Sequence, residues 1–163
     1  MVRPGFTMLE LILVLVILAL AAGLVVPALN SFARGRQMLD GAGRLLAVMQ
    51  YAQTRAMNSG RPQRLRLDPN SGNYWVTARN DGQFVRIATD SGQTYQLPAQ
   101  VQAAWDAPVD ETGQGYVEFD PDGGHDVVTL RLTDARGSQV LIACASPAEP
   151  YRIITGTSAP EAR

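Results

Sequence analysis

The sequence predicts an α+β protein in which one long N-terminal helix packs on a C-terminal head of two small antiparallel β-sheets. Three observations support this class: an uncharged run over residues 11–33, a helical apolar stripe over residues 38–56, and alternating polar and apolar residues after Gly60. The chain has 163 residues, which corresponds to one domain of ordinary size or a smaller domain with an appendage.

The uncharged run predicts a membrane helix over residues 6–30. Residues 11–33 form 23 uncharged positions, and residues 11–26 are wholly apolar, Ala or Gly. About 20 such residues cross a bilayer as a helix. The alternative is a cleaved secretory signal, but its apolar core has only about 7–15 residues and ends at a small-residue cleavage site. This run is longer, and it begins too close to the N-terminus.

Glu10 places a carboxylate at the edge of this run. A charge within a membrane costs on the order of 2–3 kcal/mol or more unless it is paired or interfacial, so such a residue is a functional candidate. The residue alone leaves two interpretations open: a functional carboxylate, or an interfacial one that marks the start of the helix.

The residues around Glu10 resemble the class III signal of type IV pilins and type II secretion pseudopilins. A short leader with Arg3 precedes Gly5, and Phe6-Thr7-Met8-Leu9-Glu10 opens the apolar helix. The resemblance implies that residues 1–5 are a leader peptide, that prepilin peptidase cuts between Gly5 and Phe6, and that Phe6 is then methylated. It also implies that Glu10 pairs with the α-amine of a neighbouring subunit, because a pair is tolerated in an apolar bundle where a lone charge is not.

Two further features concern the same helix. Pro27 lacks an N–H group and its ring clashes with the preceding turn, so we expect a kink or local melting there. Arg34, Arg36 and Arg44 outnumber Arg3, and by charge counting alone the head would stay in the cytoplasm. The signal motif implies the opposite: a single-pass protein of the bacterial inner membrane with a cytoplasmic N-terminus and a periplasmic head.

The helix is expected to continue as an amphipathic stem over residues 31–58. Its apolar face recurs at steps of four and three, and Leu39 and Leu46 are expected to widen it. Gly41 and Gly43 indicate a close contact or a weak point. Asn58-Ser59-Gly60 predicts the end of the helix. The face consists of Met38, Ala42, Leu45, Met49, Ala52 and Ala56.

Residues 61–156 are expected to form the antiparallel head. One meander is predicted over residues 63–67, 73–78 and 84–87, and a second set over residues 116–119, 127–132, 140–144 and 151–154. Residues 90–115 are expected to be an irregular connector with one short strand near Tyr95-Gln96-Leu97, and residues 157–163 a frayed tail.

The head resembles the GspH/FimT group of minor pseudopilins and minor pilins. The resemblance rests on Ala52-Gln53-Thr54-Arg55-Ala56-Met57, the hairpin that follows, and Phe119-Asp120-Pro121-Asp122-Gly123 before the closing strands. It implies a structural subunit at or near the tip of the periplasmic pseudopilus that helps to initiate assembly and to extrude exoproteins. The implied partners are other minor and major pseudopilins, prepilin peptidase, the inner-membrane assembly platform, and the outer-membrane secretin or an exoprotein.

Neither an enzyme nor a cofactor or metal site is expected. His125 is the only histidine and Cys144 the only cysteine, so paired-thiolate and multi-histidine sites are excluded. The aspartates between Asp120 and Asp126 leave a calcium loop open as an alternative, although the spacing does not complete an EF-hand and a turn explains it equally well. Trp75 and Trp105 are interpreted as core or partner-contact residues.

A minor pilin of a type IV or competence pilus that binds DNA is the alternative function. Residues 34–66 hold seven arginines and one acid, a balance of +6, whereas residues 67–163 hold six arginines and thirteen acids, a balance of −7. We therefore expect a basic stem and an acidic head. Phosphate contacts supply most non-specific affinity for nucleic acid, so an acidic head disfavours DNA binding.

Overall fold

The predicted α+β class is confirmed by the computed structural model, which describes residues 7–87 and 93–155. Between residues 22 and 35 it describes the helix backbone without the side chains. One helix, α1 (Met8–Ser59), is followed within the described residues by nine strands. The chain divides into two compact units, Met1–Gln37 and Met38–Arg163, and helix α1 belongs to both.

The first sheet is built from the meander that the sequence predicts. Strands β1 (Gln63–Leu67), β2 (Asn73–Asn80) and β3 (Gln83–Arg86) are antiparallel neighbours, and short β4 (Tyr95–Gln96) also pairs with β2. Strand β6 (Tyr116–Phe119) closes the order β3-β2-β1-β6. Its bounds match the prediction, but its grouping with the later strands was wrong, because β6 pairs with β1 from Gln63↔Phe119 to Arg66↔Tyr116.

The second sheet has the order β5-β7-β8-β9 and is antiparallel throughout. Strands β7 (Leu130–Asp134), β8 (Gln139–Ala143) and β9 (Arg152–Thr155) were predicted with small shifts of their bounds. Strand β5 (Val101–Trp105) corrects the prediction of an irregular segment there. Its alanines have low strand propensity. Its partner β7 is distant in sequence, with a register from Val101↔Asp134 to Trp105↔Leu130, so the neighbouring residues do not indicate the strand.

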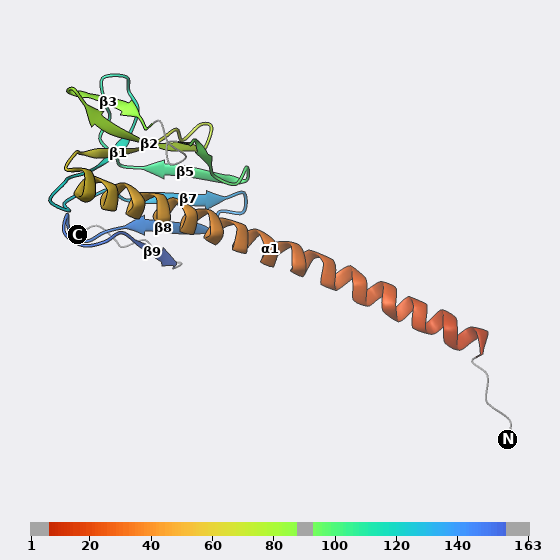
Figure 1. Ribbon diagram of the computed structural model, residues 1–163. Coiled ribbons are helices and arrows are strands. Elements are labelled where there is room, and N and C mark those ends of the chain that lie inside the picture. The colour runs from red at the N-terminus through yellow and green to blue at the C-terminus, as the bar shows by residue number, and fades with distance from the viewer. Residues whose placement is uncertain (1–6, 88–92, 156–163) are drawn as a thin grey trace. The chain divides into compact units, whose positions relative to one another are not determined.

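The stem part of α1 runs along the two sheets, as Figure 1 shows, and supplies one side of the core. The predicted apolar face is confirmed, since all six of its residues are buried. Leu46 packs against the core, whereas Leu39 is 43% exposed and the prediction that it widens the face was wrong. Gly41 marks a close contact, because a Cβ added there would lie 2.8 Å from Cδ of Pro98.

The β2–β3 hairpin turns through two residues with positive φ. Asp81 has φ of 48° and Gly82 has φ of 85°. Two-residue turns of this kind match the right-handed twist of the strands they join. Residues 80–82 were predicted to turn, and the turn holds Phe84 of β3 opposite Arg79 of β2.

Candidate assembly site

The first turn of α1 is capped by Thr7. Its hydroxyl accepts a hydrogen bond from the Glu10 backbone N–H at 3.3 Å, and its carbonyl accepts one from the Leu11 N–H at 3.2 Å. Thr-x-x-Glu is the spacing of a capping box, in which the Glu side chain also favours the helix start. Sequence reasoning missed this role of Thr7, although the motif was visible.

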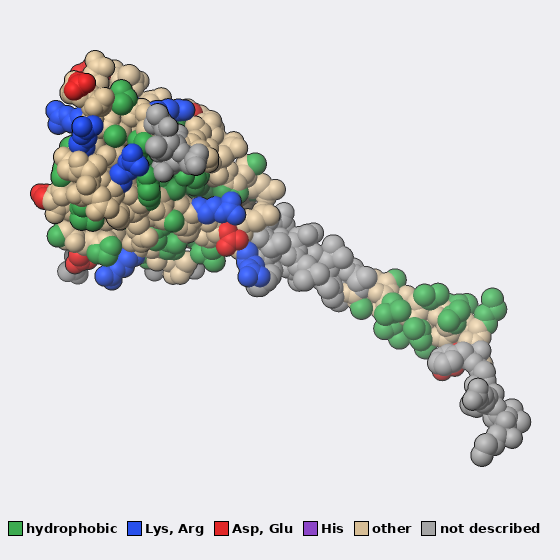
Figure 2. All heavy atoms as spheres, in the orientation of Figure 1, with side chains coloured by type: hydrophobic (Ala, Val, Ile, Leu, Met, Phe, Trp, Pro, Cys, Tyr) green, Lys and Arg blue, Asp and Glu red, His purple; other side chains and the backbone are tan. Residues whose placement is uncertain are grey.

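The first turns of α1 expose apolar side chains on every face. Figure 2 shows hydrophobic side chains covering this segment. The exposed set is Met8, Leu9, Leu11, Ile12, Leu13, Val14, Leu15, Val16, Ile17, Leu18 and Leu20. An apolar patch of this extent marks a surface that another protein or a membrane covers. Within the part of the chain that the structure describes, however, no helix meets both the length and the hydropathy needed to cross a membrane.

The other predicted processing and kink residues are not tested. Gly5 and Phe6 lie outside the described residues. Pro27 lies within α1, but its side chain belongs to the part of the helix that is described by backbone alone, and the expected kink stays a prediction. Glu10 is exposed in the first turn of α1, among exposed apolar side chains.

At its other end, α1 is joined to the turn that follows β6. The Gln53 side-chain amide donates a hydrogen bond of 2.8 Å to the Gly123 carbonyl. Met57 approaches the same glycine, whose added Cβ would lie 3.4 Å from the Met57 Sδ atom. The two segments that carry the family resemblance, residues 52–57 and 119–123, therefore meet in space.

His125 is a buried structural residue. Its side chain is 3% exposed, and its ring nitrogens lie 3.0 Å from the Asp126 carbonyl and 2.8 Å from the Glu149 carbonyl. The centre of its ring lies 4.7 Å from that of the tilted Tyr151 ring, and the Tyr151 hydroxyl donates to the Asp126 carbonyl at 2.5 Å. Burial raises the pKa of Tyr151. These contacts fasten the segment before β9 to the loop that follows β6.

Two aspartates of the 120–126 loop accept backbone hydrogen bonds in and beside the turn. Asp122 accepts the Gly124 N–H and Asp126 accepts the Glu118 N–H, each at 2.9 Å. Burial, followed by the neighbouring carboxylates of Glu118, Asp122 and Asp126, raises the pKa of Asp120. Among the described residues, no group of His, Cys, Asp and Glu side chains is arranged to hold a metal ion.

Two arginines of strand β1, Arg64 and Arg66, are neutralised by ion pairs. Helix α1 ends at Ser59, so Arg61, Arg64 and Arg66 belong to the head, and the predicted division into a basic stem and an acidic head was wrong at this point. Arg64 Nε lies 2.6 Å from the Glu118 carboxylate, and Arg66 pairs with Asp110. These pairings lower the positive potential that phosphate contacts would need.

Arg64 and the connector between β5 and β6 are held in place by several contacts. The Arg64 guanidinium lies 3.8 Å from the centre of the Phe84 ring and 3.9 Å from that of Tyr116. Asp110 accepts hydrogen bonds from the Thr112 hydroxyl at 2.5 Å and from the backbone N–H groups of Thr112 and Gln114. The pKa of Asp110 is lowered to about 2. The hydrogen bond from the Thr112 hydroxyl is the largest cause, and these N–H groups and Arg66 act in the same direction.

Comparison with known proteins identifies the family. Residues 41–156 match the family described as Type II transport protein GspH. The chain is also 27% identical over 134 residues to the type II secretion system protein H of Xanthomonas campestris pv. campestris, which covers 81% of this chain and 73% of that protein. The chain belongs to the GspH family of type II secretion minor pseudopilins. GspH proteins are structural subunits and not enzymes, in agreement with the sequence prediction.

Solved structures confirm the pilin-like fold of this GspH chain. It matches the minor pseudopilin EpsH from the type II secretion system of Vibrio cholerae with a TM-score of 0.61 at 13% identity, over 75% of this chain and 99% of EpsH. It also matches the type IV minor pilin FimU of Pseudomonas aeruginosa with a TM-score of 0.56 at 15% identity, over 80% and 97% of the two chains. At such identities the likeness shows the fold alone.

Proposed function

We propose that this GspH chain is a subunit at or near the tip of the periplasmic pseudopilus, where it helps to initiate assembly and to extrude exoproteins across the outer membrane. The observation that carries the proposal is the GspH match over residues 41–156, joined to a prepilin-type motif that opens a helix with apolar side chains on every face. A head of this family on such a helix fits a filament subunit, since neighbouring helices or lipid would cover the apolar surface.

The chain is proposed to be made as a precursor in the bacterial inner membrane. Residues 6–30 cross the membrane with the N-terminus in the cytoplasm and the head in the periplasm. Prepilin peptidase cuts between Gly5 and Phe6, and Phe6 is methylated. The mature chain then begins one residue before Thr7, so cleavage keeps the residue that caps α1.

Glu10 is proposed to set the register of assembly. Its exposed carboxylate stands in the first turn among apolar side chains. In a bundle of such helices the α-amine of a neighbouring Phe6 would supply the opposite charge, and pairing reduces the cost of removing both charges from water. The neighbours would be other minor and major pseudopilins, received from the inner-membrane assembly platform. The head would face the secretin or an exoprotein.

Cleavage after Gly5 is tested by mass spectrometry of the N-terminus of the chain purified from its native host. We expect the mature chain to begin with methylated Phe6. We expect Gly5→Ala to leave an uncut precursor, because the added Cβ would hinder the fit of this position in the active site of the peptidase. A control substitution in the leader, Val2→Ala, should be cut normally. A native chain that begins at Met1 would contradict the proposal.

A further inference from the structure

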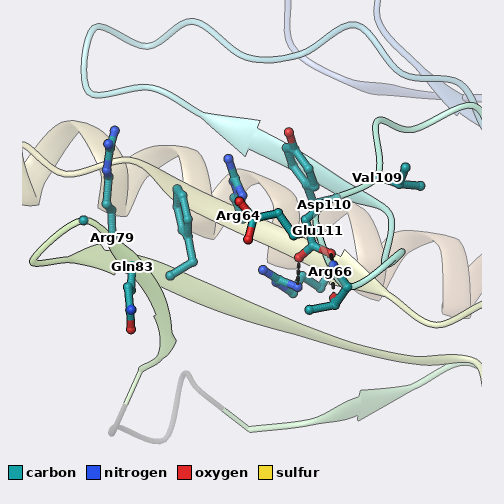
Figure 3. A pocket seen from close by; sticks show the side chains of 11 residues that line it. Arg64, Arg66, Arg79, Gln83, Val109, Asp110 and Glu111 are labelled. Atoms are coloured by element: carbon teal, nitrogen blue, oxygen red, sulfur yellow. Dashed lines mark hydrogen bonds and ion pairs between the residues drawn. The ribbon is translucent and has the colours of Figure 1, made fainter.

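An open groove of about 800 Å³ lies on the first sheet, on the face opposite its buried residues. The β2–β3 hairpin, with Arg79 and Gln83, forms one wall. The connector between β5 and β6, with Val109 and Glu111, forms the other, as Figure 3 shows. This volume is within the range of about 300–1,000 Å³ that is typical of ligand sites.

The arginines at the floor of the groove are paired with carboxylates. Arg64 is held between the Phe84 and Tyr116 rings and paired with Glu118, and Arg66 is paired with Asp110. The connector wall is closed by a bridge between Val109 and Gly115. Both arginines of the floor therefore have carboxylate partners within the chain, and the buried Nε of Arg66 has no hydrogen-bond partner among the described residues.

Two charges on the walls remain unused. The exposed side chains of Arg79 and Glu111 have neither a hydrogen-bond nor an ion-pair partner among the described residues. They carry opposite signs and stand on different elements, one on the hairpin and one on the connector. A ligand that lies along the groove thus meets a cation at one wall and an anion at the other.

We propose that this groove binds an extended segment of a partner protein that offers an acidic side chain to Arg79 and a basic side chain to Glu111. Arginine and aromatic side chains, which line the groove, are enriched at protein interfaces. A nucleic acid fits poorly, because Arg64 and Arg66 are already paired with carboxylates and its phosphates would meet the unpaired carboxylate of Glu111. The opposite charges of Arg79 and Glu111 favour a segment that carries both signs, and they would fix the position of that segment along the groove.

This inference rests on the proposed function only for where the partner occurs, namely among the proteins that meet the head in the secretion machine. Binding by the purified full-length chain in detergent micelles tests the groove without a filament. Failure of the groove and failure of the filament role are therefore distinguishable.

The probes are blocked synthetic peptides with Glu at one end, Lys at the other, and Ser-Val repeats of increasing number between them. Fluorescence anisotropy measures the Kd, and amide shifts of Gly82, Gln83 and Thr112 in NMR spectra locate the contact. We expect Arg79→Gln to weaken binding by about threefold, as for an exposed ion pair, and Glu111→Gln to do the same. Arg131→Gln, an exposed arginine on β7 of the second sheet, is the matched control and should leave the Kd unchanged.

A double-substitution cycle separates the proposed pairing from general charge effects. Replacing the probe's Glu by Gln should weaken binding to the unaltered chain but not to Arg79→Gln, since the partner charge is already gone. Equal loss in both chains would overturn the proposal. So would equal binding of a probe with both charges removed, or amide shifts confined to the second sheet.

Discussion

At the scale of single residues, Glu10 combines a place in the capped first turn of α1 with a proposed role in assembly. Its backbone N–H donates to the Thr7 hydroxyl, and this cap affects helix formation within one chain. Its charge is proposed to affect the association of different chains. A substitution that removes both roles cannot tell them apart, so the residue has to be tested with variants that separate charge from capping.

We expect Glu10→Gln to abolish incorporation into the filament while leaving helix and membrane insertion intact. Glutamine retains the capping-box hydrogen-bonding capacity but has no charge to pair with a neighbour's α-amine. Thr7→Ala is the converse control, since it removes the cap at a cost of about 1 kcal/mol and keeps the charge. The measurement is exoprotein secretion, together with the amount of the chain in sheared pseudopili. Normal secretion by Glu10→Gln would remove the pairing role.

Gly41 and Gly43 are two residues apart in α1 but have different surroundings. A Cβ at Gly41 would meet the Pro98 ring at 2.8 Å, whereas one at Gly43 has nothing within 4 Å. Alanine at an open helical position stabilises by up to about 1 kcal/mol. Overpacking costs about 1–3 kcal/mol.

We therefore expect Gly43→Ala to raise the free energy of unfolding by up to about 1 kcal/mol. Gly41→Ala should lower it by about 1 kcal/mol, because the clash exceeds the gain in helix propensity. Urea unfolding followed by the fluorescence of Trp75 and Trp105 measures both. The pair serves as its own control, and equal effects of the two substitutions would contradict the contact with Pro98.

At the scale of elements, the end of α1 and the turn after β6 depend on each other. Gln53 links them through its hydrogen bond to the Gly123 carbonyl, and β6 in turn pairs with β1. The link connects residues that are 70 positions apart, so it depends on the tertiary fold that brings them together.

Gln53→Ala should destabilise the head by about 1 kcal/mol, since it leaves the Gly123 carbonyl without its donor. Gln50→Ala, at an exposed position of the same helix, should change stability by no more than about 0.5 kcal/mol. Urea midpoints of the two variants can be compared directly. A similar small effect of both substitutions would show that the turn does not depend on the helix.

The connector between β5 and β6 should respond to acid through Asp110. Its pKa is lowered from 3.8 to about 2 in the folded chain, so the folded state favours the ionised form. The resulting stability is fully present above pH about 4 and is lost as the pH falls through about 2. Asp110→Asn should be less stable at neutral pH and show a smaller loss of stability between these values. Parallel pH profiles for the two chains, measured by urea unfolding, would contradict this assignment.

At the scale of the whole molecule, the net charge of a chain segment does not predict where unpaired charge lies, because ion pairs join segments of opposite charge. The arginines of residues 61–66 lie in the head, where Glu118 and Asp110 neutralise Arg64 and Arg66. The same two pairs leave Arg79 and Glu111 as unused charges at the groove. A structural subunit that recognises proteins through a few exposed charges is consistent with membership of the GspH family.

The sequence by itself determined the elements whose signals are local. The apolar face of α1 repeats with helical period, β1 and β6 alternate, and the Asp81-Gly82 turn has the residues that positive φ favours. The motif around Gly5 and Glu10 is local in the same way and indicated a pilin-like chain, whereas residues 52–57 and 119–123 carried the resemblance to the GspH family.

Only the tertiary structure decided what depends on distant residues meeting. Strand β5 exists because β7 supplies its partner, β6 joins the first sheet because β1 is free beside it, and Leu39 is exposed because the sheets cover another arc of the helix. The groove also depends on distant residues, because ion pairs join β1 to β6 and to the connector. Arg79 and Glu111 stay outside these pairs. Such pairings carry no periodic signal along the chain, because their energy comes from contacts that form when the chain folds.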